Sequence, residues 1–382
     1  MVVARRLNLS RLLAKKSFFL FGPRATGKST LIAQQLTPQA HVIDLADSNQ
    51  LLAHTNNPAK LEEDVAYHKR ELVVIDEIQL LPQLLNDVQR LITGGKRFLL
   101  TGSSTRRLRH GRANLLAGRA WLAHLFPLVS YEISNFNLNR YLHYGGLPAV
   151  YFSDEPDEEL DAYISVYLQE EIRAEGLVRK LPAFTRFLRV MAISSGEVLN
   201  MAKVANDAQV AATTVSGHVE ILEDTLLGAL LPPWGGSQKR KATRTAKFYF
   251  FDTGVTRVLA GLTSIDRNSS AYGKSFEQFI WMELRAYLSY TRKKLSLTYW
   301  RSHQGHEVDF LIGEEVAIEV KATRVISKRD FKGLRALADE GCFKKFYLVS
   351  HDKLNSRSGQ FIAMHWQTFL DQLWSDKLLA KQ

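Results

Sequence analysis

"FGPRATGKST", residues 21–30, lies near the start of the sequence and indicates the fold of the N-terminal domain. It fits the pattern GxxxxGK[S/T], with Gly22, Gly27, Lys28 and Ser29 at the defining positions. The apolar run "KSFFLFG" precedes it, and "STLIAQQL", which has helical spacing, follows it. A glycine-rich turn between a buried strand and a helix N-terminus lets backbone N–H groups face phosphate oxygens. The stretch predicts a phosphate-binding loop, and the alternative is a chance match in an ordinary strand-turn-helix.

The residue types of this loop suit ATP with Mg²⁺. We expect a side chain at Gly27 to obstruct the approach of the phosphates, Lys28 to neutralise the β and γ phosphates, and Ser29 to ligate Mg²⁺. The residues expected to bind the cofactor are Gly22, Pro23, Arg24, Ala25, Thr26, Gly27, Lys28, Ser29, Thr30 and Asp76.

Two carboxylates end the apolar segment "ELVVIDEIQ", residues 71–79. A buried parallel strand delivers such acids to the nucleotide edge of a sheet. We expect Asp76 to hold Mg²⁺ through water and Glu77 to orient and polarise the attacking water; the alternative is that both acids merely begin a surface loop. "HVIDLAD", residues 41–47, predicts an extra strand inserted between the two sites, an order typical of ATPases with a glutamate-activated water.

A further strand, "KRFLLTGSS", ends in hydroxyl side chains that would lie beside the γ phosphate. Ser103 is the expected sensor of hydrolysis, followed by Ser104. Five arginines come next, namely Arg106, Arg107, Arg109, Arg112 and Arg119. One of them, for which we choose Arg119, is expected to enter the site of a neighbouring subunit and stabilise transition-state charge. A surface role or contact with a DNA backbone is the alternative for each.

The composition limits the classes of protein. The chain has 382 residues, 46% of them hydrophobic, and a formal net charge of +11, which favours polyanionic partners. Cys342 is the only cysteine, which excludes an internal disulfide and a cysteine-based zinc site. The apolar run "SFFLF" is too short to span a membrane, and no signal-peptide pattern precedes it. We expect a cytoplasmic protein with several domains and no membrane partner.

The middle of the chain predicts helices followed by a helix-turn-helix. "YGGLPAV", residues 144–150, predicts a boundary, and the second helix opens at Thr213 and Thr214 with Val215, Val219 and Leu222 on one face. If this winged-helix-like unit binds DNA, Thr213, Thr214, Ser216 and His218 would face it; otherwise the unit is a packing adaptor. The basic run "SQKRKATRTAK" would be a wing contacting phosphates or a solvated face, and its candidate DNA contacts are Lys239, Arg240, Lys241 and Arg244.

From residue 273 the expected order is helix, three strands, helix, strand, a small α/β domain. In "HEVDFLIGEEVAIEVK" a turn near Gly313 places Asp309 approximately opposite Glu319, with Lys321 on the same face as Glu319. Two carboxylates and a lysine at a sheet edge would bind Mg²⁺ or Mn²⁺ and support phosphodiester hydrolysis, and Glu277 would add a carboxylate to the metal. The alternative is a solvated hairpin face.

With both sites in view, the chain resembles prokaryotic AAA-type ATPases that carry a C-terminal restriction-endonuclease-like domain of the PD-(D/E)xK kind, catalogued as a domain of unknown function. The landmarks are "GPRATGKST", "LVVIDEIQ", "LTGSS", "LAGRA", "YGGLPAV", "KFYFFDTG", "FEQF" and "EVDFLI…AIEVKAT". The resemblance implies an α/β P-loop ATPase domain (1–143), a helical lid or linker (144–195), a winged-helix-like domain (196–262) and a nuclease-like α/β domain (263–382). It also implies that the chains assemble as a homo-oligomeric ring, for example a hexamer.

These observations predict an ATPase that drives DNA translocation, unwinding or remodelling of branched or duplex DNA in the manner of a helicase. The C-terminal domain would grip or cut that DNA. Two alternatives stay open: a nucleotide-switched regulator or defence-type scaffold without DNA chemistry, and an ATP-gated, metal-dependent nuclease.

Overall fold

The computed structural model describes residues 3–37, 39–104, 116, 118–168 and 181–379. The N-terminal part is built on one parallel sheet whose order is β2-β3-β4-β1-β5. Its strands are β1 (Ser17–Phe21), β2 (Ala40–Asp44), β3 (Leu72–Asp76), β4 (Arg97–Gly102) and β5 (Ala120–His124). Its helices are α1 (Leu9–Leu13), α2 (Lys28–Leu36), α3 (Ser48–Asn56), α4 (Lys60–His68), α5 (Leu84–Thr93) and the 3₁₀ turns η1 (Ile78–Leu80) and η2 (Ser130–Glu132).

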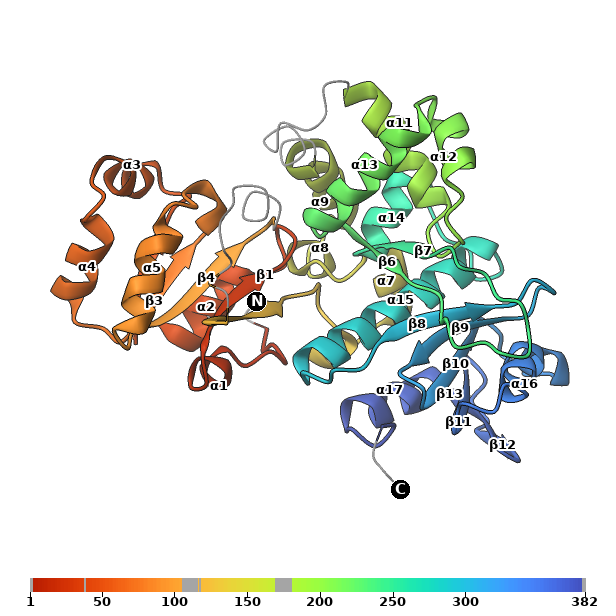
Figure 1. Ribbon diagram of the computed structural model, residues 1–382. Coiled ribbons are helices and arrows are strands. Elements are labelled where there is room, and N and C mark those ends of the chain that lie inside the picture. The colour runs from red at the N-terminus through yellow and green to blue at the C-terminus, as the bar shows by residue number, and fades with distance from the viewer. Residues whose placement is uncertain (1–2, 38, 105–115, 117, 169–180, 380–382) are drawn as a thin grey trace.

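Strand β1 explains why this sheet has two covered faces. All five of its residues are buried, and they alternate between two cores. Phe18 and Leu20 pack with α1 and α2, whereas Phe19 and Phe21 pack with α4 and α5. A continuous apolar run of this kind is the signature of a central parallel strand between two helical layers. The predicted P-loop fold class is confirmed for this domain, which lies at the left in Figure 1.

The strand order corrects one expectation. The segment at residues 41–47 does form a strand, β2, but β2 pairs only with β3 at the edge of the sheet. The strand that lies between β1 and β3 is β4, which pairs in parallel with both. Crossover connections need not place a strand next to its predecessor in sequence, so adjacency along the chain was a poor guide here.

The middle region is mostly helical. Its elements are α7 (Leu138–Tyr144), α8 (Pro148–Tyr151), α9 (Pro156–Ala162), the π-helical η3 (Tyr163–Leu168), α11 (Leu181–Ile193), α12 (Met201–Ala208), α13 (Ala212–Asp224), β6 (Gly228–Leu231), β7 (Lys247–Phe250) and α14 (Thr253–Leu259). Strands β6 and β7 form an antiparallel pair, and the long loop 232–246 joins them. Helices α11 to α13 followed by this hairpin have the element order of a winged helix, which stays a prediction.

The C-terminal part begins with the expected order of helix, three strands, helix and strand, and two further strands and a helix that were not expected follow. It contains α15 (Ser270–Tyr290), β8 (Leu297–Arg301), β9 (Glu307–Ile312), β10 (Val316–Lys321), the 3₁₀ turn η4 (Lys328–Phe331), α16 (Lys332–Ala338), β11 (Lys345–Ser350), β12 (Ser356–Ser358), β13 (Phe361–His365) and α17 (Trp366–Trp374). The sheet order is β12-β13-β11-β10-β9-β8. One core packs α15 and α17 on one face, and a second packs α16 on the other.

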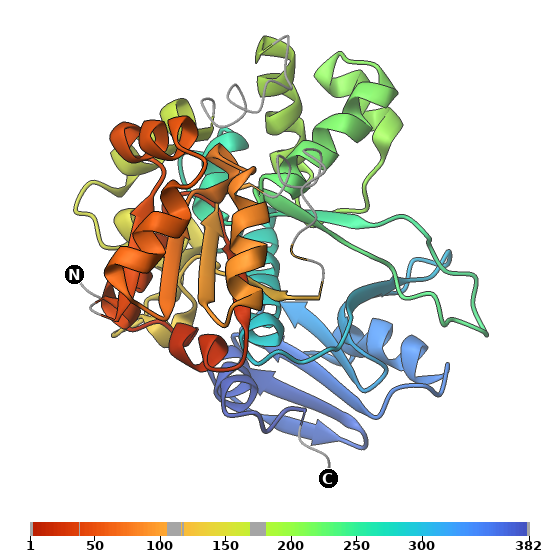
Figure 2. The ribbon, with the colours of Figure 1, turned by 60° about the vertical axis from the view of Figure 1, so that its left-hand side comes forward.

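The three parts pack into one body, with the middle region above the C-terminal sheet (Figures 1 and 2). Leu128, Val129 and Ile133, which follow the N-terminal sheet, belong to the same core as α15. Buried Glu283 of α15 accepts hydrogen bonds from the N–H of Ser130 at 2.6 Å and from the indole of Trp374 at 2.6 Å. Among the residues described, no helix is long and apolar enough to cross a membrane.

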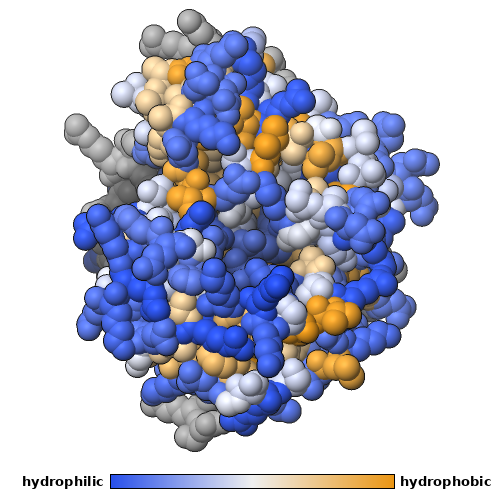
Figure 3. Space-filling view, turned by 90° about the vertical axis from the view of Figure 1, so that its right-hand side faces the viewer, coloured by the Kyte–Doolittle hydropathy of each residue, from blue (hydrophilic) through white to orange (hydrophobic). Residues whose placement is uncertain are grey.

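Hydrophilic side chains predominate on the face shown in Figure 3, in keeping with the 23% of charged residues in the chain. Apolar side chains gather there in small groups over the middle region above and over the C-terminal domain below.

Candidate functional site

The phosphate loop connects β1 to α2 as the sequence predicts. Gly27 precedes α2 with φ +90°, a left-handed conformation that favours glycine. A Cβ at Gly22 would lie 2.4 Å from the carbonyl oxygen of Leu125, so this glycine is required by space. At Gly27 the nearest protein atom to such a Cβ is 3.7 Å away, so within the chain itself the requirement is the backbone angle; the expected obstruction of the phosphates stays a prediction.

The loop encloses its lysine. Lys28 is 6% exposed, and its ammonium donates to the carbonyl oxygens of Gly22 at 2.8 Å and Pro23 at 3.2 Å. A pocket of about 380 Å³ lies alongside, and its lining includes Arg24, Ala25 and residues 27–30 of the loop together with Glu77 and Gln79. The ammonium is therefore held at the place where the loop's N–H groups and the start of α2 favour an anion.

The hydroxyl and carboxylate expected to bind Mg²⁺ meet at the edge of the sheet. Ser29 at the start of α2 donates to a carboxylate oxygen of Asp76 at 2.7 Å, and Thr101 at the end of β4 donates to the other oxygen. Asp76 is 8% exposed and ends β3. A serine hydroxyl beside a buried carboxylate is an oxygen donor set that suits Mg²⁺, so the residues present fit the ion.

Glu77 is held apart from Asp76 by its backbone. Its φ of +55° turns the chain sharply after β3, and its N–H donates to the hydroxyl of Thr101 at 3.2 Å. Its carboxylate accepts hydrogen bonds from the amide of Gln79 and, at 3.4 Å, from the hydroxyl of Ser103. Gln79 also donates to Ser103 at 3.3 Å. Glu77, Gln79 and Ser103 thus form a closed triangle that orients the carboxylate.

Ser103, the expected sensor of hydrolysis, lies within hydrogen-bond reach of this carboxylate, and Ser104 is likewise buried; the sensor role stays a prediction. Gln79 was not predicted, although its position two residues after Glu77 was visible in "DEIQ". A Cβ at Gly102 would lie 2.7 Å from the side-chain oxygen of Gln79. The glycine of "TGSS" therefore makes room for this glutamine.

Arg5 is a second residue that the sequence did not reveal. Its guanidinium donates to Glu132 at 2.9 Å, to the carbonyl oxygen of Thr26 at 2.7 Å and to that of Phe126 at 2.6 Å. Arg5 and Glu132 are both buried, and the neighbouring charges of Tyr290 and Glu132 outweigh burial and raise the pKa of the arginine. The N-terminal segment is in this way fastened to the phosphate loop.

The arginines expected to act in trans are only partly described. Arg119 is exposed just before β5. Arg106, Arg107, Arg109 and Arg112 lie outside the described residues. The assignment of Arg119 stays a prediction.

The expectation that His218 of the middle region faces DNA is wrong. Thr213, Thr214 and Ser216 are exposed on α13, but His218 is 8% exposed and packs between the rings of Phe184 and Phe187 at 4.7 and 4.9 Å. Burial lowers its pKa. His218 is a core residue because it lies three residues after Val215 and four before Leu222, on the buried face of the helix.

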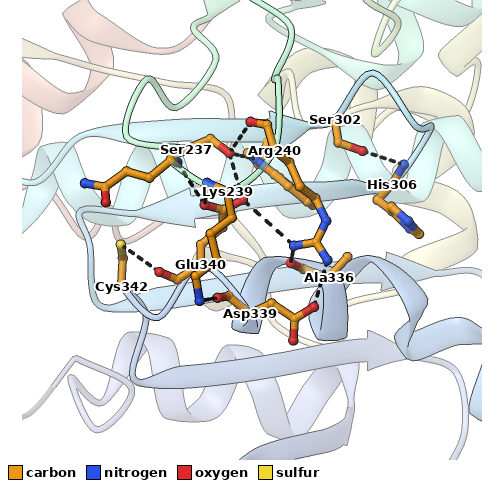
Figure 4. A network of polar contacts seen from close by, with 11 residues as sticks. Ser237, Lys239, Arg240, Ser302, His306, Ala336, Asp339, Glu340 and Cys342 are labelled. Carbon is orange, nitrogen blue, oxygen red and sulfur yellow. Dashed lines mark hydrogen bonds and ion pairs between the residues drawn. The ribbon is translucent and has the colours of Figure 1, made fainter.

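The basic loop between β6 and β7 is bound to the C-terminal domain, so two of its candidate DNA contacts, Lys239 and Arg240, are engaged within the chain (Figure 4). Arg240 donates to Asp339 at 2.7 Å and to the carbonyl oxygen of Ala336 at 2.6 Å. Glu340 accepts from the N–H groups of Gln238 and Lys239 at 2.9 and 2.8 Å, and the ammonium of Lys239 donates to the carbonyl of Asp339. Lys241 and Arg244 are exposed.

The same loop covers the edge of the C-terminal sheet. Pro233 bridges to Tyr299 of β8, and Ala242 bridges to Ser302 just beyond β8. An uncovered edge strand offers unpaired backbone groups to other chains, and this loop satisfies several of them. The loop then delivers Lys247, the first residue of β7, into the C-terminal domain.

Lys247 lies at the centre of an acidic cluster. It is 2% exposed, and its ammonium is 2.6 Å from Glu307, 3.1 Å from Glu277 and 3.8 Å from Asp309. Glu277 also accepts a hydrogen bond from the hydroxyl of Tyr249. Although burial alone would lower the pKa of Lys247, these acidic neighbours together raise it well above its usual value. The available sequence signal was a lysine at the start of the apolar strand segment "KFYF".

Asp309, Glu319 and Lys321 come together as predicted. Strands β9 and β10 are antiparallel with Phe310 opposite Ile318, so Asp309 and Glu319 are the next residues along, and Asp309 accepts from the N–H of Val320 at 2.8 Å. Lys321 forms an ion pair with Glu319 at 2.6 Å. Burial, followed by the charge of Glu277, raises the pKa of Asp309 to about 7. Burial and the charge of Asp309 raise the pKa of Glu319 well above its usual value.

The predicted metal set of Glu277, Asp309 and Glu319 does not fit a divalent cation in this arrangement. One oxygen of Glu319 is buried without a hydrogen-bond partner among the described residues, as a metal ligand would be. However, the described residues contain no group of three acidic, histidine or cysteine side chains placed to hold a metal ion. Lys247 and Lys321 supply the positive charge instead, because Lys247 stands between Glu277 and Asp309.

Another buried carboxylate, that of Asp252, ties two of the sequence landmarks together. Asp252 of "KFYFFDTG" accepts from the N–H of Gly146 in "YGGLPAV" at 2.7 Å and caps α14 through the N–H of Val255 at 3.1 Å. A Cβ at Gly145 would lie 1.9 Å from Asp252. Burial raises the pKa of Asp252 to about 6. Both landmarks are therefore structural contacts between segments of the middle region.

Three domain families match the chain in succession. Residues 14–134 match the family described as "AAA domain". Residues 135–266 match "Domain of unknown function (DUF8612)", and residues 272–369 match "Domain of unknown function (DUF4143)". The first match agrees with the phosphate loop and strand order described above, and the N-terminal domain is an AAA-type ATPase domain.

Relatives span bacteria and archaea. Uncharacterized proteins of Mycobacterium bovis and Mycobacterium tuberculosis are each 29% identical over 266 residues, which is 66% of this chain and 59% of theirs. The chain thus spans less than two thirds of the length of these two relatives. An uncharacterized protein of Methanocaldococcus jannaschii is 24% identical over 428 residues, covering 93% of this chain and 85% of its own length.

Distant similarities to solved structures complete the comparison. The Aeropyrum pernix ORC1 protein in complex with DNA is 12% identical, with a TM-score of 0.27, over 66% of this chain and 90% of that one. The replication initiator DnaA bound to AMPPCP and single-stranded DNA is 12% identical, with a TM-score of 0.31, over 58% and 90%. At such TM-scores nothing about the function of this chain follows.

Proposed function

We propose that this protein is an ATP-driven DNA-processing motor. The observation that carries the proposal is the arrangement at the edge of the parallel sheet, where Ser29 donates to Asp76 at 2.7 Å and Glu77 is oriented separately by Gln79 and Ser103. In this arrangement the carboxylate of Asp76 would bind the metal ion, and the carboxylate of Glu77 would activate the attacking water. That division of labour is what hydrolysis of a phosphoanhydride requires.

Each residue of the site has a distinct task in this proposal. The loop N–H groups and Lys28 bind the phosphates, and Lys28 exchanges the carbonyl oxygens of Gly22 and Pro23 for phosphate oxygens. Bound Mg²⁺ would neutralise charge that develops on the phosphates. Glu77 accepts a proton from the attacking water, and Gln79 and Ser103 keep its carboxylate in place. In this proposal Ser103 also responds to loss of the γ phosphate.

DNA is the proposed partner because the chain carries a net charge of +11. A phosphate backbone binds a basic protein through counterion release, and such binding weakens steeply with salt. The packing of the three parts into one body would transmit changes at the phosphate loop to the C-terminal domain. Assembly into a ring with Arg119 acting in trans is part of the proposal.

The position of Lys247 argues against DNA cleavage as the role of the C-terminal domain. The lysine neutralises two of the carboxylates that a catalytic metal would need, with contacts of 3.1 Å to Glu277 and 3.8 Å to Asp309. The C-terminal domain then serves to hold DNA. A regulatory scaffold without DNA chemistry is the competing outcome.

The test is the steady-state ATPase rate of the purified protein alone and with single-stranded, duplex and branched DNA. We expect stimulation by at least one of these forms that disappears as salt is raised. The Glu77→Gln variant is the control for contaminating ATPases. A turnover rate that ignores every nucleic acid, with intact hydrolysis, would favour the scaffold over the motor.

A further inference from the structure

A cleft of about 980 Å³ lies at one end of the C-terminal sheet. Its walls are the segments that follow two neighbouring parallel strands, 322–324 after β10 and 351–353 after β11, together with Trp366 after β13. Arg267 and Asn268, just before α15, close another side. In open α/β sheets, ligands bind where the carboxyl ends of parallel strands meet, and this cleft has that position.

Three cations line the cleft. Arg267, Arg324 and Lys353 come from three separate segments, and all three side chains are exposed. Arg240 of the basic loop, in contrast, forms an ion pair with Asp339 at 2.7 Å. Within the described part of the chain, no ion pair joins any of the three lining cations to a carboxylate.

Asp352 is the one carboxylate among the lining residues, and it is already committed. It accepts hydrogen bonds from the N–H groups of Ile326 and Leu354, each at 3.0 Å. These bonds lower its pKa. Asp352 therefore joins the two loops, and its single negative charge is outnumbered by the three lining cations, which leaves the cleft with a surplus of positive charge.

The floor of the cleft carries an unsatisfied polar atom. Nε2 of His351 is buried and has no hydrogen-bond partner among the described residues. The N–H of His351 donates to the carbonyl of Thr323 at 3.0 Å, which joins the two loops. Burial lowers the pKa of His351 to about 4, and the charges of Arg267 and Arg324 add to this effect. His351 lines the electropositive cleft, and its buried Nε2 keeps an unused hydrogen-bonding position in the wall.

We infer that this cleft binds the phosphodiester backbone of a DNA strand. The three cations surround a cavity at the upper end of the ~300–1,000 Å³ range of small-ligand pockets, and positive charges carried by separate segments match successive phosphates better than a single anion. The inference rests on the proposed function and adds the place at which DNA is held. The cleft begins one residue beyond Lys321, at the end of the strand that carries Glu319.

The test compares two variants that each remove two exposed positive charges. Arg267→Ala with Arg324→Ala alters the cleft, and Lys241→Ala with Arg244→Ala alters the basic loop predicted from sequence to contact DNA. Affinity for fluorescent single-stranded and duplex oligonucleotides is measured by anisotropy over a range of salt. We expect the cleft variant to bind about tenfold more weakly, with a salt slope smaller by about 1.4 to 1.8, and the loop variant to stay within about twofold of the wild type.

The outcomes separate the cleft from the proposed function. If the loop variant loses affinity and the cleft variant does not, the inference about the cleft is overturned while DNA binding stands. If the wild type binds no DNA, both fail. Free pyrophosphate is the third probe: loss of pyrophosphate binding in the cleft variant with unchanged oligonucleotide binding would also overturn the inference. Unchanged thermal unfolding shows that both variants are folded, because exposed substitutions alter stability little.

Discussion

Replacement of Lys247 by methionine tests whether the acidic cluster of the C-terminal domain depends on an internal cation. The ammonium lies 2.6, 3.1 and 3.8 Å from three carboxylates and is 2% exposed. Removal of one partner from a buried charge pair costs about 3–5 kcal/mol. Because the side chains of Glu277 and Glu307 are 20% and 29% exposed and reach water, we expect the lower end, about 3 kcal/mol.

The loss should depend on pH with a definite sign. The pKa of Asp309 is already about 7 with Lys247 present, and loss of the cation raises it further. The folded variant then binds more protons than the unfolded chain, so its stability falls as pH rises. The difference from the wild type should therefore be small near pH 5 and largest above pH 7.

Urea unfolding followed by tryptophan fluorescence measures this effect. Trp281 stacks on Tyr249 with ring centroids 4.9 Å apart and so reports on the cluster directly. Lys241→Met, at an exposed position of the same loop, is the matched control. Glu307→Gln in the Lys247→Met background should restore part of the loss. A Lys247→Met variant within about 0.5 kcal/mol of the wild type at pH 8 would refute the reasoning.

Four further outcomes are expected. Lys28→Ala should abolish tight ATP binding in titration calorimetry, since the ammonium is the loop's side-chain cation at the phosphates; unchanged affinity would contradict the assignment. Glu77→Gln should bind ATP but hydrolyse it about a hundredfold or more slowly in a phosphate-release assay, unless the base is another residue. Gln79→Ala should keep ATP affinity and slow hydrolysis about tenfold, because Glu77 loses its orienting amide; an equal fall in affinity would instead indicate a structural role. Burial raises the pKa of Glu283 from 4.5 to about 7, so its contribution to stability is present below pH 4.5 and lost, by about 3 kcal/mol, as pH rises through 7. Unfolding free energies of wild type and Glu283→Gln between pH 5 and 8 check this, and equal slopes would count against it.

The N-terminal site was largely predictable because its residues sit at fixed offsets from strand ends. Asp76 ends β3, Thr101 lies near the end of β4, and parallel strands bring their carboxyl ends to one edge. The hairpin of β9 and β10 was predictable for a similar reason, since an antiparallel turn sets which residues face each other. The sequence did not reveal the order of the strands in the N-terminal sheet, because that order depends on the crossover connections.

Contacts between distant segments account for most of what sequence reasoning missed. The basic loop finds its acidic partners in Asp339 and Glu340, and Lys247 finds Glu307, through the docking of the middle region on the C-terminal sheet. No local periodicity encodes such a meeting. His218 is different, because its spacing from Val215 and Leu222 already placed it on the apolar face of α13. The expectation that His218 faces DNA followed from its polar side chain and overlooked its position on the apolar face.

The coupling of the nucleotide site to DNA is tested most directly by the DNA affinity of the Glu77→Gln variant with and without saturating ATP. If ATP at the phosphate loop and DNA on the rest of the molecule act on a common conformational equilibrium, ATP should change the dissociation constant for DNA by about 5- to 150-fold, and DNA should change ATP affinity by the same factor. Lys28→Ala should show no such change. Identical DNA affinity in both states of Glu77→Gln, with ATP demonstrably bound, would contradict the account.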